Sequence, residues 1–117
     1  MIATPLHDGT VTHQYLQGAL QTLSAFRGRL RFETQIGSIL PRNRDLLTQR
    51  FIDSNCTHLL FIDGDVGWRP DDVTALIDSH EWVVSGCYPR KQQDKRVPAR
   101  LLSQTGTVRA AKYAPAG

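Results

Sequence analysis

The chain has 117 residues, a formal net charge of +3 and an apolar content of 40%, which fits one globular domain with a real core. No apolar run approaches the roughly 20 residues that cross a bilayer, and the first residues lack the order of a signal peptide, so a cytoplasmic protein without a membrane span is expected. The cations are scattered and no nucleic-acid motif is present, which argues against a nucleic-acid partner. Cys56 and Cys87 lack metal-ligand spacing, so we expect both to be reduced.

The first third of the chain alternates short apolar runs with helical periodicity. Residues 1–4 are expected to form a buried strand that breaks at Pro5, and residues 11–26 a helix capped by Thr10 or Thr12. Residues 30–35 alternate in polarity as a second strand. The inward positions expected for the helix are those at helical spacing: Tyr15, Leu16, Ala19, Leu20, Leu23 and Phe26.

A second helix is expected from about Pro41, with a polar stop at residues 53–55. Its inward face would carry Leu46, Leu47, Phe51 and Ile52. Residues 59–62 then form a continuous apolar run, as expected for a central parallel strand that is covered on both faces.

The remainder of the chain predicts one more helix, one more core strand and a hairpin. A helix is expected to begin at Pro70, residues 82–85 form a fourth strand, and residues 97–103 and 108–113 flank a turn. Strands that alternate with helices pair in parallel through right-handed crossovers. We therefore predict an α/β fold: an open, mostly parallel, Rossmann-like sheet with helices on both faces, in one domain of core 1–91 and extension 92–117.

Two carboxylates follow the strongest predicted strand. Asp63 and Asp65 are separated by Gly64 and come directly after the run 59–62. Ligands of open parallel sheets bind beyond the carboxyl ends of the strands, and paired carboxylates are hard oxygen ligands for Mg²⁺ or Mn²⁺. The pattern favours a metal that bridges to a diphosphate, whereas the structural alternative is an ordinary polar turn.

Around these acids, residues 58–65 resemble the aspartate-any-aspartate segment of glycosyltransferases with the GT-A fold. Residues 3–5 with Gly9 and residues 11–16 resemble the opening of small family 2-like members, and residues 40–44 and 86–91 resemble their later blocks. The resemblance covers residues 3–91. It departs from the family at Asp45, where an asparagine is usual, and at residues 7–8, where an aromatic-glycine pair is expected.

The resemblance implies that Asp63 and Asp65 hold a metal-bound nucleoside diphosphate sugar, with Mn²⁺ or Mg²⁺ as the cofactor. Thr4, Pro5 and Asp8 would line the nucleotide pocket. The cations Arg42, Arg44 and Arg90 would contact phosphate, although an exposed surface role is the alternative for each.

Transfer of the sugar to an acceptor needs a base, and no residue is selected for that role; Asp94 and an acid from another subunit are both open. The short segment after residue 91 favours a second reading, a non-catalytic module that binds a nucleotide or a partner. An open sheet edge also favours pairing with a second copy as a homodimer. A haloacid-dehalogenase-like phosphatase is a third reading, because such enzymes use two aspartates at this spacing after a strand.

Overall fold

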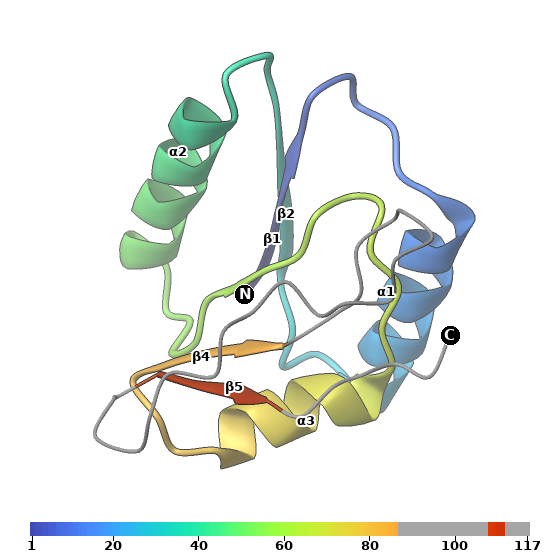
Figure 1. The fold of residues 1–117 in the computed structure, drawn as a ribbon, viewed down its shortest axis with the longest axis vertical. Helices are drawn as coiled ribbons and strands as arrows, with labels where there is room; N and C mark the ends of the chain where they lie inside the picture. The colour runs from blue at the N-terminus through green and yellow to red at the C-terminus, as the bar shows by residue number, and fades with distance from the viewer. Residues whose placement is uncertain (87–107, 112–117) are drawn as a thin grey trace. The chain divides into compact units, whose positions relative to one another are not determined.

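The computed structural model describes residues 1–86 and 108–111. The chain divides into two compact units, Met1–Pro70 and Asp71–Gly117. The first unit holds the candidate site and contains strands β1, β2 and β3 with helices α1 and α2 (Figure 1).

The first unit is built on a three-stranded parallel sheet in the order β2-β1-β3. These strands are β1 (Ile2–Leu6), β2 (Phe32–Ile36) and β3 (Leu60–Phe61). The predicted α/β class and parallel pairing are confirmed. The prediction that residues 59–62 form the central strand is wrong, because β3 pairs with β1 alone among the described strands, whereas β1 pairs on both sides and is buried throughout.

Pro5 determines where the ladder between β1 and β3 ends. Ile2 N–H donates to Arg31 O on the β2 side at 2.8 Å, and Ala3 O accepts from Ile62 N–H on the β3 side at 3.1 Å. Because backbone groups alternate along a strand, the nitrogen of Pro5 faces β3, and it has no hydrogen to donate. The strand itself does not break there as predicted, since Leu6 O still accepts from Gly37 N–H on the β2 side at 2.9 Å.

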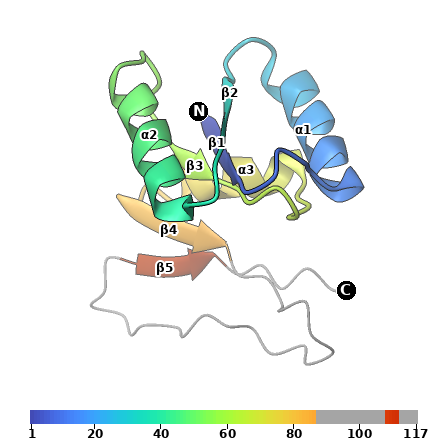
Figure 2. The same cartoon turned by 90° about the horizontal axis from the view of Figure 1, so that it is seen from above.

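Helix α1 (His13–Phe26) lies on one face of this sheet and α2 (Leu40–Ile52) on the other (Figure 2). Thr12 caps α1, because its hydroxyl accepts from the Tyr15 N–H at 3.3 Å. The buried stripe of α1 is Tyr15, Gly18 and Thr22. The prediction that Leu16, Leu20 and Leu23 point inward is wrong, because all three are exposed and Gly18 and Thr22 face the unit's core instead. Tyr15 is buried, as predicted.

Helix α2 covers β1 and β2 with a narrower apolar face than predicted. Leu47 is 0% exposed, as expected, whereas Leu46 is 41% exposed and Ile52 is 64% exposed, so these two predictions are wrong. The second buried residue of α2 is Asn43, whose Nδ2 donates to Gly37 O at 2.9 Å. One turn of helix separates Asn43 from Leu47, so the same face points at the sheet with one polar and one apolar side chain.

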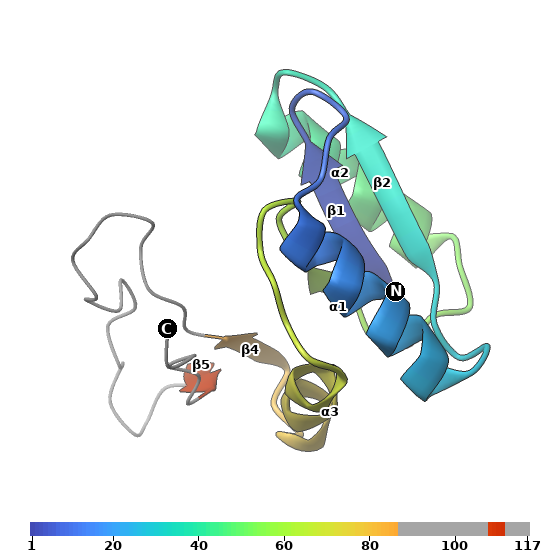
Figure 3. The same ribbon diagram turned by 90° about the vertical axis from the view of Figure 1, so that its right-hand side faces the viewer.

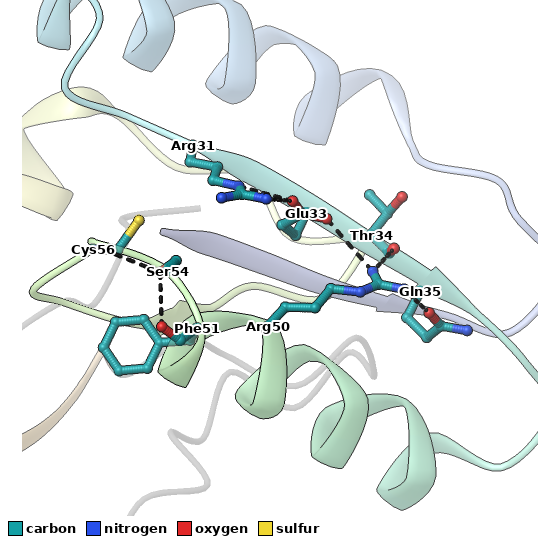
Figure 4. Close-up of polar contacts among 8 residues, drawn as sticks. All are labelled: Arg31, Glu33, Thr34, Gln35, Arg50, Phe51, Ser54 and Cys56. Atoms are coloured by element: carbon teal, nitrogen blue, oxygen red, sulfur yellow. Dashed lines mark hydrogen bonds and ion pairs between the residues drawn. The ribbon is translucent and has the colours of Figure 1, made fainter.

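An arginine of α2 covers the outer edge of β2. Arg50 donates to Thr34 O at 3.0 Å, to Gln35 Oε1 at 2.5 Å and to Glu33 Oε2 at 3.5 Å (Figure 4). Since Arg31 O faces β1, the backbone of Thr34 faces away from the sheet. The guanidinium therefore satisfies a carbonyl on the open edge of β2.

In the second unit, α3 (Pro70–Asp78) begins at Pro70 as predicted, with Asp71 and Asp72 in its first turn. The strand predicted at residues 82–85 is observed as β4 (Val83–Gly86). It pairs in parallel with β5 (Val108–Ala111) in a separate two-stranded sheet. The prediction that residues 82–85 add a fourth strand to the main sheet is therefore wrong among the described strands. The predicted hairpin partner, residues 97–103, lies outside the described residues.

The structure also bears on the predictions about membrane spans and about the cysteines. Within residues 1–86 and 108–111, none of the helices combines the length and apolar character needed to cross a membrane. Cys56 is a free thiol, as predicted, and Cys87 lies outside the described residues.

Candidate functional site

A cleft of about 350 Å³ lies at the carboxyl ends of β1 and β3. It brings together two of the predicted segments, one after each strand. The lining residues are Pro5, Leu6, His7, Asp8, Thr10, Val11, Thr12, Leu40, Asp63, Gly64 and Asp65. Three carboxylates separated by up to 57 residues of sequence thus line one cleft, at the edge of the sheet where the strand-end rule places a ligand.

Asp63 and Asp65 lie in a tight turn. Val66 N–H donates to Asp63 O at 3.1 Å, which closes a four-residue β-turn. A Cβ on Gly64 would lie 2.6 Å from Leu6 Cδ2 and 3.3 Å from Thr10 O. Glycine is needed here because the turn presses against the loop after β1, and this contact presents the two flanking carboxylates to the cleft.

Asp8 is held by the loop that follows β1. Its Oδ1 accepts from the Thr10 hydroxyl at 2.8 Å and from the Thr10 N–H at 3.1 Å. These hydrogen bonds, the hydroxyl one first, lower the pKa of Asp8 below its usual value, so the exposed carboxyl is ionised at neutral pH. Thr10 was predicted only as a helix cap; the Asp-x-Thr spacing of an Asx turn is the local signal for its actual role.

Arg44 supplies a cation beside the acid pair. Its Nη2 lies 3.4 Å from Asp63 Oδ1, and both side chains are nearly half exposed. An ion pair of this length and exposure contributes at most about 1 kcal/mol to stability. The guanidinium is therefore free to exchange a carboxylate partner for a phosphate at little energetic cost.

The donor set fits a divalent metal that is shared with a ligand. Among the described residues, no group of three or more His, Cys, Asp or Glu side chains is arranged to hold a metal ion. Mg²⁺ commonly takes one or two carboxylates and completes its shell with phosphate and water oxygens. Asp63 and Asp65 match that mode, and they do not match a site in which the protein alone coordinates the metal.

The other predicted site residues are dispersed. Thr4 is fully buried and its hydroxyl lies 2.6 Å from the Tyr15 hydroxyl, so it supports the core and does not line the cleft. Arg42 lines a different cavity of about 280 Å³, together with Gln35, Ile36, Gly37, Ser38, Ile39, Asn43 and Leu46. Arg90 and Asp94 lie outside the described residues.

The separation of Arg42 from Arg44 follows from helix geometry. Two residues correspond to about 200° of rotation, so neighbouring arginines at this spacing point to opposite sides of α2. Of these two arginines, Arg44 is the one that pairs with an acid of the cleft, Asp63.

Comparison with protein-family models, with curated proteins and with solved structures finds no match for the chain. The cleft and the residues that line it therefore provide the structural basis for inferring a function.

Proposed function

We propose that the chain binds a nucleoside diphosphate sugar through a divalent metal, Mn²⁺ or Mg²⁺, as the donor-binding part of a GT-A-like glycosyltransferase. The observation that carries the proposal is the convergence of Asp8, Asp63 and Asp65 on one cleft at the carboxyl ends of parallel strands. This support adds to the order of sequence blocks that resembles the family.

The charge of the cleft explains why a metal is part of the proposal. Three carboxylates repel a bare diphosphate, so a diphosphate enters favourably only with a cation between the two sets of oxygens. Asp65 and Asp63 would share that metal, which when bound neutralises charge on the diphosphate leaving group. Arg44 would turn from Asp63 toward a phosphate oxygen.

Pro5 and Asp8 also line the cleft, and in this proposal they would contact the nucleoside part of the donor. The proposal assigns no catalytic base and no acceptor. Donor binding is therefore the activity proposed, and sugar transfer would in addition require an acceptor. A non-catalytic module that binds nucleotide would use the same residues.

The test is calorimetric titration of nucleoside diphosphates and their sugars, with Mn²⁺ and with EDTA. We expect Mn²⁺-dependent binding that Asp65→Asn weakens by at least about tenfold, as loss of a metal-site contact typically does. Asp53→Asn is the matched control, because Asp53 is exposed after α2 and lies outside the lining of the cleft.

Absence of binding to every donor by the folded wild-type protein would reject the proposal. Equal binding with Mn²⁺ and with EDTA would reject the role of the metal. Release of phosphate from a phosphomonoester, lost in Asp63→Asn, would instead favour the phosphatase reading.

A further inference from the structure

The segment that carries the two acids lies along α1 and contacts it at three places. We call residues 63–68, between β3 and α3, the acidic loop (Figure 3). The first contact is at the helix cap, where Thr12 N–H donates to Gly64 O at 2.8 Å. A backbone hydrogen bond thus joins the N-cap of α1 to the turn that carries the two carboxylates.

The second contact is two residues further along the chain, in the first turn of the helix. A Cβ on Gly67 would lie 3.0 Å from Gln14 Cβ, so the loop backbone packs directly against the helix side chain. Gly67 therefore allows close approach to α1, whereas Gly64 allows close approach to Leu6 and Thr10, and a larger side chain at either position would push the loop outward.

The third contact is the indole of Trp68, seated on Gly18. A Cβ on Gly18 would lie 2.8 Å from Trp68 Cδ2 and 3.0 Å from Trp68 O. The indole Nε1 donates to Thr22 Oγ1 at 2.9 Å, and the ring meets Tyr15 edge-on with centroids 5.0 Å apart. This contact explains why Gly18 and Thr22 are buried in α1 together with Tyr15, whereas the leucines are exposed.

The residues of α1 that contact the Trp68 indole are also connected to β1 by hydrogen bonds. The Thr22 hydroxyl that accepts from Trp68 donates to Gly18 O at 2.6 Å, so both of its roles are used. The Tyr15 hydroxyl lies 2.6 Å from Thr4 Oγ1 on the central strand. Burial raises the pKa of Tyr15, against a smaller lowering by Thr4, so the phenol stays neutral in this core.

We propose that Trp68, seated on Gly18 and Thr22, is a positioning residue that sets where Asp63 and Asp65 stand in the cleft. The acidic loop lies outside helices and strands, so its place depends on the hydrogen bond to the helix cap and on its packing against α1, in which Trp68 buries the largest side chain of the loop. The consequence for ligand binding depends on the proposed function, whereas the consequence for loop position does not. A metal site depends on such support, because ligands displaced by about 1 Å lose much of their affinity.

The experiment compares Gly18→Ala with wild type by two readouts. Without ligand, amide chemical shifts report the position of residues 63–66; with ligand, titration of Mn²⁺ and a nucleoside diphosphate reports affinity. Alanine favours helix over glycine, so α1 itself is not weakened by the change. We expect large shifts across residues 63–66 and an affinity lower by on the order of tenfold, the effect typical of lost supporting contacts.

Gly86→Ala is the matched control, since a Cβ there meets no atom within 4 Å. Should Gly18→Ala fail to fold, Thr22→Val removes the acceptor for the indole, and Thr22→Ser keeps it. We expect the valine variant to reproduce the shifts and the serine variant to restore the wild-type spectrum.

The proposal would be overturned if the amide chemical shifts of residues 63–66 stayed unchanged in Gly18→Ala or in Thr22→Val. It would also be overturned if a variant with changed shifts bound Mn²⁺ and the nucleoside diphosphate as tightly as wild type. If wild type binds no diphosphate but the loop amides still move, the proposed function fails and the positioning role of Trp68 stands.

Discussion

At the scale of single residues, the two arginines of the second helix illustrate how position decides chemistry. Both were candidates for phosphate contact, and both lie near the start of α2. Arg44 lies 3.4 Å from Asp63, whereas Arg42 lines the cavity beside Gly37 and Asn43. The acidic cleft therefore has one nearby cation from this pair, and that cation is the one to test.

Arg44→Ala is expected to lower the affinity for Mn²⁺ and a nucleoside diphosphate by about tenfold, or about 1.4 kcal/mol, because a charge-assisted contact to phosphate is lost. Its effect on unfolding free energy should stay below about 1 kcal/mol, since the ion pair with Asp63 is half exposed. Arg42→Ala is the matched control in the same titration. Equal losses in both variants would contradict a specific role for Arg44.

At the scale of elements, the two long helices show which part of an apolar pattern becomes core. In α1 the leucines are exposed and the small residues Gly18 and Thr22 are buried, because Trp68 occupies the space beside them. In α2 one leucine of a neighbouring pair is buried and the other is not. Apolar periodicity identified both helices, and the partner that packs on each helix determined its inward face.

The neighbouring leucines of α2 make this difference measurable. Leu47→Ala should destabilise the protein by about 2–5 kcal/mol, as removal of a fully buried leucine does, because it leaves a cavity against the sheet. Leu46→Ala, at a position that is 41% exposed, should cost less than about 1 kcal/mol. Urea unfolding followed by circular dichroism gives both values; similar losses would mean that the inward face of α2 is assigned wrongly.

At the scale of the whole molecule, the edges of the main sheet bear on self-association. Among the described strands, β2 and β3 each pair only with β1, so both are edges. Unpaired edge groups template pairing with another chain unless they are covered or charged. The Arg50 guanidinium covers the carbonyl of Thr34 on the β2 edge, which disfavours strand pairing there.

Arg50→Ala should therefore increase self-association, because it exposes the Thr34 carbonyl and removes a cation from the edge. Sedimentation velocity over a concentration series measures the effect as a rise in average mass. Arg29→Ala removes the same charge from the exposed loop after α1 and serves as the control. A monomeric Arg50→Ala protein would show that β2 is protected by other means.

What the sequence determined by itself is local. Helical spacing located α1, α2 and α3, alternation and apolar runs located β1 to β4, and the acids at the end of one strand marked the cleft. These features depend on backbone periodicity and on turn chemistry, which act over a few residues. Asp63 and Asp65 could be chosen in this way because ligands of a parallel sheet bind at the carboxyl ends of its strands, whereas Pro5 and Asp8 were chosen from the family resemblance.

Only the tertiary structure decided the long-range choices. It made β1 the central strand, paired β4 with β5, buried Thr4 in the core and separated Arg42 from the acids. Each choice depends on which distant group occupies the space beside a residue, as Trp68 does beside Gly18, 50 positions earlier in the chain. Periodicity carries no information about that partner, because steric fit and hydrogen bonding across the fold select it.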